Sequence, residues 1–340
     1  MPDGQTALLV ITILVALSFD FTNGFHDTAN AVATSIGTRA MSPVAAVGIS
    51  AVLNLVGAVV AIVLLHSHVS NTIGGLVAPE HGVGLSVIIA ALAGAIAWNL
   101  ITWRLGLPSS SSHALIGALI GMGLAAYGVS AVKWGQVIPV VLALVTSPIV
   151  GMLLAGGFSV LLFNVFRRAL PGTANRRFRL LQLFSASFVS FSHGANDAQK
   201  TMGVITLALL ATHHLTKNGG AFPSPPLWVV VAAASAIGFG TYAGGWRIIR
   251  TLGMRVIRLE PVDGFAAQTM AAVVIQGATQ LALPVSTTHV VSGAVLGSGV
   301  TRRPGAVRWG IARNILVAWV LTIPAAAVIA GVCALIAGAV

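Results

Sequence analysis

NGFHDTAN, at residues 23–30, places a carboxylate, a histidine and two asparagines within a long apolar run. HGANDAQK, at residues 193–200, repeats the pattern, so that Asp27 and Asp197 follow a glycine at the same spacing. A carboxylate inside a membrane segment is costly, and it therefore faces a cavity, a partner or an ion. Together the two stretches indicate a functional polar site inside a membrane protein.

The composition of the whole chain is that of a membrane protein. Of the 340 residues, 56% are hydrophobic and only 7% carry a formal charge, whereas ordinary soluble domains carry roughly a quarter charged residues. We therefore expect an all-α, polytopic integral membrane protein with roughly 10 to 12 membrane segments. The apolar stretches that predict these segments are 6–38, 44–65, 84–103, 106–127, 136–163, 180–212, 227–246, 263–282, 283–300 and 309–339.

The positive charges indicate how the segments are oriented. A net charge of +11 would suggest nucleic acid as a partner of a soluble protein, but here the arginines cluster in short segments between apolar runs. Short basic loops are typical of the cytoplasmic side of a membrane, so we expect no nucleic-acid partner. We expect the basic segment 164–181 to be a cytoplasmic linker between a first membrane repeat, 1–163, and a second, 182–340. The loops 66–83 and 213–226, which are poor in lysine and arginine, should lie outside.

The same charge bias predicts that the two halves cross the membrane in opposite directions, as an inverted repeat. A second pair of motifs supports the repeat: PSSSSH at 108–113 aligns with PVSTTH at 284–289, and a glycine-rich stretch follows each. Apolar segments that are interrupted at matching positions of two repeats are typical of transporters with a site at mid-membrane. We therefore expect broken helices or re-entrant hairpins.

The repeated carboxylates and the amides around them suggest a cation site. Their oxygens suit a hard cation or a proton. The alternative is a structural ion pair between an aspartate and the buried cation Lys200. Asp20 has no acidic counterpart in the second half, so we leave it outside the predicted site. The predicted ligands of the coupling ion are Asp27, Asp197, Asn23 and Asn196.

The hydroxyl clusters suggest an anion site. A serine or threonine just before a helix leaves the first backbone N–H groups free to bind an anion, with help from the helix dipole. Two such helix starts suit a tetrahedral oxyanion, and ordinary N-capping is the alternative. His113 and His289 close the clusters as candidates for proton handling or substrate contact, or else as packing residues. The candidate hydroxyls are Ser110, Ser111, Ser112, Ser286, Thr287 and Thr288.

Together the motifs resemble those of the inorganic phosphate transporter (Pit) family over nearly the whole chain. NGFHDTANAVAT and FSHGAND are closest to the bacterial low-affinity phosphate permeases, and WNLITWRLGLPSSSSH, TSPIVG and QTMAAV add to the match. The resemblance implies phosphate uptake across the cytoplasmic (inner) membrane by cation symport, with alternating access. It also implies a transporter rather than an enzyme, with no cofactor, in the lipid bilayer and often as a homodimer.

By position, the resemblance places Asp27, Asn30 and Asp197 at the ion and phosphate site, and the two hydroxyl clusters at the phosphate cradle. We add Lys200 to the phosphate-binding candidates, because a buried cation attracts an anion. Ala198, Gln199 and Lys200 stand where the family's second signature often has valine, alanine and asparagine.

The coupling ion stays open between H⁺ and Na⁺. Bacterial permeases of this type resemble proton symporters that carry phosphate with a divalent metal such as Mg²⁺. Asn54 and Gln268 align with glutamates of eukaryotic sodium-coupled members, which weakens the case for sodium. Sodium-coupled prokaryotic members also exist.

Three alternatives remain open on the sequence. A transporter of another tetrahedral anion, such as sulfate or arsenate, would use the same hydroxyl cradle. An intramembrane enzyme would need a serine–histidine pair in hydrogen-bond reach and an oxyanion hole. A channel would need a continuous polar path and no coupling.

Overall fold

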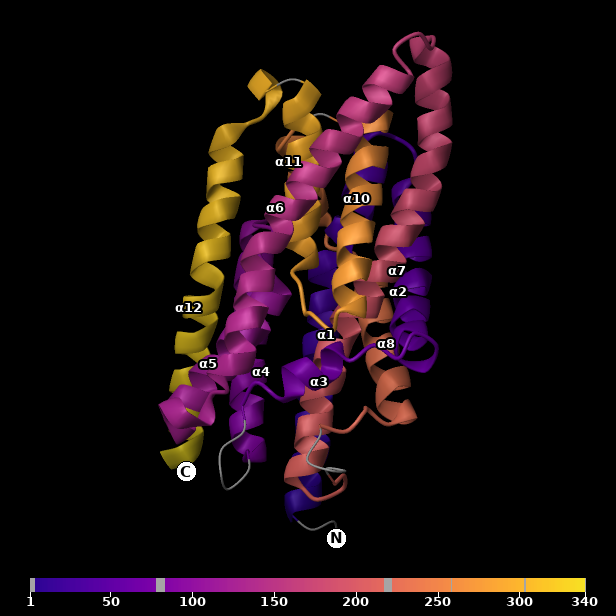
Figure 1. The fold of residues 1–340 in the computed structure, drawn as a ribbon. Helices are drawn as coiled ribbons and strands as arrows, with labels where there is room; N and C mark the ends of the chain where they lie inside the picture. Colours follow the sequence, from indigo (N-terminus) through magenta and orange to yellow (C-terminus); the bar gives the residue numbers. More distant parts are fainter. Residues whose placement is uncertain (1–3, 78–82, 217–221, 258, 303, 340) are drawn as a thin grey trace.

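The structure, a computed structural model, describes residues 4–77, 83–216, 222–257, 259–302 and 304–339. Over these residues the protein is a bundle of α-helices (Figure 1). Every apolar stretch expected from the sequence contains a helix. The elements are α1 (Gly4–Gly37), α2 (Pro43–Val63), α3 (Val69–Gly74), α4 (Leu85–Leu105), α5 (Ser111–Tyr127), η1 (Val129–Ala131), α6 (Trp134–Val165), α7 (Pro171–Ala211), α8 (Leu227–Ala243), α9 (Trp246–Arg250), η2 (Thr251–Arg255), α10 (Pro261–Gln280), α11 (Thr287–Arg302), η3 (Pro304–Ala306) and α12 (Trp309–Ala339).

Five of the described helices are each long and apolar enough to cross a bilayer, namely α1, α2, α4, α6 and α12. α8 and the following short helix, joined by a bend of 58°, make a sixth candidate when they are counted as one span. The outward faces are apolar: Leu153 on α6 is 65% exposed and Val320 on α12 is 74% exposed. Such faces are stable against lipid rather than water, so the chain is a multi-pass integral membrane protein.

The serine and threonine motifs lie at the tips of two helix hairpins. α4 and α5 are antiparallel, because Tyr127 at the end of α5 accepts a hydrogen bond of 2.7 Å from the backbone just before α4. α10 and α11 are antiparallel as well, because Arg302 at the end of α11 lies 3.0 Å from Asp263 at the start of α10. The hairpins open toward opposite ends of the molecule (Figure 1). Their tips meet where Ser112 donates to the carbonyl of Val285 over 3.1 Å.

The helices pack as two inverted copies of one arrangement. α1 packs on α8 while its counterpart α7 packs on α2, and α5 packs on α12 while α11 packs on α6. A side-chain carbon at Gly24 would overlap the carbonyl of Ile237 on α8, and one at Gly194 would overlap the carbonyl of Asn54 on α2. These aligned glycines let the backbones touch, as small residues do between membrane helices. The expected inverted repeat is therefore confirmed in the packing.

The glycine-rich stretches after the hydroxyl motifs support the hairpins in the same way. Gly117 and Gly121 of α5 lie directly against the backbone of α12, and Gly293 and Gly297 of α11 lie against the backbone of α6. Close backbone contact of this kind strengthens van der Waals packing where no hydrophobic effect operates. Each repeat thus supplies the supporting helix for the hairpin of the other.

The polar stretches do not break their helices, since α1 continues through Asp27 and α7 through Asp197. Among the described residues, conformational breaks lie at the two hairpin tips and at the 58° bend between α8 and α9. The expected linker 164–181 is largely helical, because α7 begins at Pro171, a proline at the first helical position. Part of each expected outer loop, residues 78–82 and 217–221, lies outside the described residues.

The arginines that the sequence places inside gather at one end of the molecule. Arg39, Arg179 and Arg302 line a cavity of about 600 Å³ near the end of α1. Arg247 of α9 donates to the carbonyl of Arg104 at the end of α4 over 2.7 Å, at the level of Phe25 on α1. Basic segments on a single side are what the positive-inside rule requires. The assignment of this side to the cytoplasm stays a prediction.

Candidate functional site

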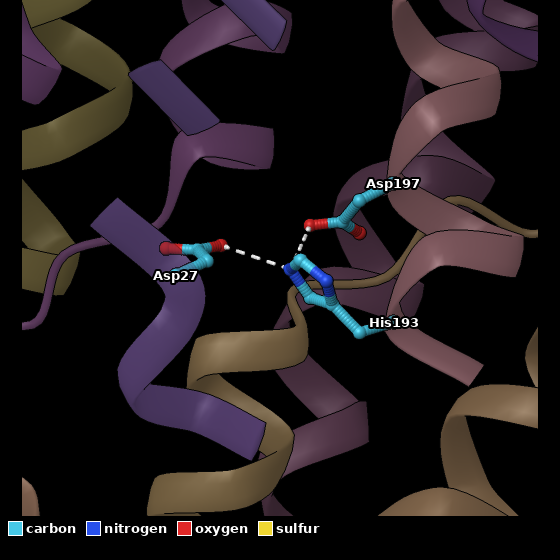
Figure 2. Close-up of side chains that lie close together, drawn as sticks. All are labelled: Asp27, His193 and Asp197. Atoms are coloured by element: carbon cyan, nitrogen blue, oxygen red, sulfur yellow. Dashed lines mark ion pairs between the residues drawn. The ribbon is translucent and has the colours of Figure 1, made fainter. Parts of the chain in front are cut away.

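The two aligned carboxylates meet around a histidine between α1 and α7. His193 Nε2 lies 3.3 Å from a carboxylate oxygen of Asp197 and 3.9 Å from one of Asp27 (Figure 2). His193 and Asp197 share one face of α7, since they are four residues apart. One nitrogen and two carboxylate oxygens from the three side chains lie within 4.8 Å of one another. This spacing allows a proton or a cation to be shared among them.

Asn54 of α2 fixes which nitrogen of His193 faces the carboxylates. The Thr241 hydroxyl donates to the carbonyl of Ile237 over 2.8 Å, so it accepts the hydrogen bond of 2.8 Å from the Asn54 amide nitrogen. The amide oxygen of Asn54 therefore points at His193 Nδ1, 3.0 Å away, and Nδ1 carries the proton. In the neutral ring, Nε2 then presents a lone pair to Asp27 and Asp197.

His26 connects the Asp27 carboxylate to the first hairpin. Its Nδ1 lies 2.8 Å from Asp27 Oδ1, and its Nε2 lies 3.2 Å from the hydroxyl of Thr102 on α4. Ser109, at the hairpin tip, donates to Thr102 over 2.7 Å. A movement of the first hairpin tip would therefore change the hydrogen bonding of His26 to Asp27 through Thr102.

The second hairpin contacts both carboxylates directly. At the start of α11, the Thr287 hydroxyl lies 3.4 Å from Asp27 and 3.2 Å from Asp197. The Thr288 hydroxyl lies 3.2 Å from Asp27 and accepts a hydrogen bond of 3.0 Å from the Asn30 amide. The predicted cation motifs and one predicted anion motif are therefore parts of a single site.

Lys200 links the second carboxylate to both hairpin tips. Its ammonium pairs with Asp197, so the ion pair that the sequence left open as an alternative is present. It also donates to the Ser112 hydroxyl over 2.5 Å and to the carbonyl of Val285 over 3.0 Å. These contacts place the only lysine of the polar stretches at the point where the two hydroxyl motifs meet.

The two helix starts combine N-capping with free donors. Ser110 accepts the backbone N–H of His113 over 3.1 Å, and Ser286 accepts that of His289 over 3.2 Å. Both serines thus act as N-caps. The first N–H groups of a helix have no intrahelical partner. Those left to an anion belong to Ser111, Ser112, Thr287 and Thr288.

Several predicted ligands make no hydrogen bond to Asp27 or Asp197 within the described part of the chain, and Asn196, Asn23 and Ser111 are among them. Asn196 holds the second hairpin instead, because its amide donates to Thr279 over 2.9 Å and its oxygen accepts from the backbone of Val285 over 3.4 Å. The side-chain oxygens of Asn23 and Ser111 are buried without a hydrogen-bond partner among the described residues.

His113 and His289 face each other at the hairpin tips. Their ring centroids are 4.2 Å apart, and the ring of His289 stacks on Trp319 of α12 at 3.8 Å. Both histidines line a largely apolar cavity of about 640 Å³ between α6 and α12. The packing alternative is therefore present in the structure, whereas proton handling by these rings stays a prediction.

The sequence prediction missed His26 and His193 as site residues. Both lie within or at the edge of the quoted polar stretches. The spacing of His193 and Asp197, four residues, could have shown that they share a helix face. Thr102 carries no such signal, because only the packing of α4 against α1 brings it to His26.

All predicted site residues are buried, and none has more than 4% of its surface exposed. They come from α1, α5, α7 and α11 and from the hairpin tips. The site is thus closed to solvent at both ends in this conformation. A ligand reaches it only when the surrounding helices or hairpins move.

Comparisons with known proteins agree with this geometry. The model of the Phosphate transporter family matches residues 23–330. A probable low-affinity inorganic phosphate transporter of Rhizobium meliloti is 46% identical over 96% of this chain and 95% of its own length, and one of Bacillus subtilis is 43% identical over 96% of both. A solved structure described as the sodium-dependent phosphate transporter is 25% identical, with a TM-score of 0.85, covering 98% of this chain and 100% of its own. The chain therefore belongs to the phosphate transporter family.

Proposed function

We propose that this chain is a secondary active symporter that imports inorganic phosphate across the cytoplasmic membrane, driven by a gradient of H⁺ or Na⁺. The observation that carries the proposal is the orientation of His193, whose Nε2 faces two carboxylates. With a neutral ring this arrangement is repulsive. It becomes favourable when a proton binds Nε2 or a small cation binds between Nε2 and the carboxylates. The site therefore requires a bound proton or cation that the protein itself does not supply.

Cation binding also releases the groups that bind the anion. The hydroxyls of Thr287 and Thr288 now point at carboxylate oxygens, and a cation competes for the same oxygens. Once freed, these hydroxyls and the N–H groups at the starts of α5 and α11 can donate to phosphate. Phosphate beside unneutralised carboxylates is repelled, so the cation binds first and the anion follows. This order couples the two fluxes.

Lys200 makes the two carboxylates unequal in this mechanism. Its ammonium already neutralises Asp197 and lies at the meeting point of the hairpin tips. Asp27 has only histidine and hydroxyl partners among the described residues. We therefore assign the exchangeable cation mainly to Asp27 and His193, and we assign Lys200 to phosphate attraction.

The closed site supports alternating access. None of the site residues is more than 4% exposed, so no open path of the kind that a channel requires passes through them in the described part of the chain. The two hairpins approach the site from opposite ends (Figure 1). Movement of one hairpin at a time would open the site to one side only. This is the movement that a coupled carrier needs.

The choice of phosphate rests on the family, because hydroxyl and N–H donors alone accept any tetrahedral oxyanion. The relatives from Rhizobium meliloti and Bacillus subtilis are named as inorganic phosphate transporters, which favours phosphate over sulfate. Membership of a transporter family also decides against an intramembrane enzyme. The proposal includes two further points. Phosphate is carried as a complex with Mg²⁺, and the protein assembles as a homodimer.

The test is uptake of radiolabelled phosphate into proteoliposomes, with sodium, pH and magnesium varied one at a time. We expect accumulation above equilibrium that requires a cation gradient, and loss of it in Asp27→Asn and Asp197→Asn. Asp3→Asn, at the chain terminus, is the control for the loss of one carboxylate. Unchanged accumulation in both site variants would show that Asp27 and Asp197 are not the site of coupling. Faster uptake of sulfate than of phosphate would show that phosphate is not the preferred substrate. The oligomeric state is measured by crosslinking in the same membranes.

A further inference from the structure

A further buried carboxylate lies on α1, outside the site described above. Asp20 is 0% exposed, and neither of its carboxylate oxygens has a hydrogen-bond partner among the described residues. It precedes Asp27 by about two helical turns, roughly 10 Å along the same face of the helix. The proposed mechanism does not use it.

Two more polar side chains lie at the same level. Thr201 of α7 and Asn23 of α1 lie beside the Asp20 carboxylate. The hydroxyl of Thr201 and the side-chain oxygen of Asn23 are both buried without a hydrogen-bond partner in the described ranges. α1 and α7 run in opposite directions, because Thr38 near the end of α1 donates to Gln182 near the start of α7. Thr201, one turn beyond Asp197, therefore faces the earlier part of α1.

The chemistry of these groups points to a cation. The Thr201 hydroxyl and the Asn23 amide nitrogen are donors within reach of Asp20, but both groups are neutral and neither balances the charge of the carboxylate. A buried carboxylate without a positive partner is costly, and a bound cation both neutralises it and contacts the side-chain oxygens of Asn23 and Thr201. The charged groups that face Asp20 from α7 are Asp197, which adds negative charge, and His193. The surroundings therefore repel an anion.

The arrangement occurs in the first repeat only. In the aligned repeat, Ser190 stands in place of Asp20, and its hydroxyl donates to the carbonyl of Ala186 over 2.8 Å within its own helix. Ala31 stands in place of Thr201. Because Ser190 fills the aligned position without a charge, helix packing alone does not require a carboxylate at Asp20.

We propose that Asp20, Asn23 and Thr201 form a second cation site, which takes a monovalent cation, Na⁺ or H⁺, besides the one at Asp27. Asn23, which the sequence assigned to the Asp27 site, belongs to this second site. The inference rests on the proposed symport. Each transported phosphate is then accompanied by one cation at Asp20, in addition to the cation bound by Asp27 and His193.

The test compares Asp20→Asn with Ser190→Ala, the matched position of the second repeat. The cation-to-phosphate ratio is obtained in proteoliposomes from the membrane potential at which net phosphate flux reverses, with sodium and proton gradients in separate arms. We expect Asp20→Asn to lose one cation per phosphate, in the sodium arm or in the proton arm, and Ser190→Ala to keep the wild-type ratio. An unchanged ratio in both arms overturns the second site.

Thr201→Val tests the site without removing the charge. It should raise the cation concentration for half-maximal uptake about tenfold, which corresponds to one lost ligand contact, while phosphate affinity at saturating cation stays unchanged. An unchanged cation requirement overturns the site even if Asp20→Asn fails to fold.

If the wild type does not accumulate phosphate, the symport proposal fails by itself. Sodium binding and acid–base titration of purified wild type and Thr201→Val then decide the Asp20 site separately, and equal values in both proteins overturn it.

Discussion

The ammonium of Lys200 lies 2.5 Å from the hydroxyl of Ser112, so a side chain of the second repeat holds the hairpin of the first. Its counterpart in the first repeat, Asn30, is neutral and donates instead to the threonines at the start of α11. One carboxylate of the aligned pair therefore has a permanent positive partner, and the other has none of that kind among the residues that the structure describes. The asymmetry suggests one fixed and one exchangeable charge.

Replacing Lys200 tests the fixed charge. In Lys200→Asn, Asp197 loses its permanent partner, and a second exchangeable cation must neutralise it before phosphate binds. We expect the cation concentration for half-maximal phosphate uptake to rise at least about tenfold. Lys133→Asn, an exposed lysine at the start of α6, should behave as wild type. A normal cation requirement in Lys200→Asn would show that the ion pair is only structural.

His193 should determine whether uptake follows the cation gradient. In His193→Gln the group between the two carboxylates can no longer take up a proton. We expect phosphate accumulation to stop responding to pH if the proton is the driving ion, while sodium-driven uptake would fall less. The measurement is initial uptake across a pH series with and without sodium. His68→Gln, at an exposed side chain just before α3, is the control. A wild-type pH response in His193→Gln would contradict the mechanism.

Thr288 should matter for the anion more than for folding. Thr288→Val keeps the shape of the side chain and removes the hydroxyl that contacts Asp27 and Asn30. In the proposed mechanism this hydroxyl donates to phosphate, and a hydrogen bond to a charged group is worth about 1.5–3 kcal/mol, so phosphate uptake should fall more than about tenfold. Thr206→Val removes a buried hydroxyl whose one hydrogen bond among the described residues is to its own helix, and it should keep near-normal uptake. Equal losses in the two variants would indicate a general packing effect.

The crossing of α1 and α8 should tolerate no side chain at Gly24. In Gly24→Leu the new atoms overlap the backbone of α8, and overpacking of this kind typically costs about 1–3 kcal/mol. We expect a lower unfolding temperature in detergent by fluorescence-detected size exclusion. Gly157→Leu, on an open face of α6 where no atom lies within 4 Å, should unfold at the wild-type temperature. A stable Gly24→Leu protein would contradict the close crossing.

The sequence by itself determined the membrane class, the helical segments and the inverted repeat. Apolar length decides which segments enter a bilayer, and the charge bias of the loops decides their relative direction. The two aligned aspartates and the two hydroxyl motifs were visible because polar residues are rare in such segments. The close helix crossings were also encoded, in glycines such as Gly24 and Gly194 that align between the repeats.

Only the tertiary structure decided which polar groups meet. Asn196 and Asn23 stand beside the aspartates in sequence, yet Asn196 holds a hairpin and Asn23 faces Asp20. His193 became central because Asn54, from another helix, fixes its ring. The direction of a side chain around a helix follows from spacing, but its partner depends on how the helices cross and on their relative depth. Those quantities are set by packing between distant segments, which no local pattern of residues contains.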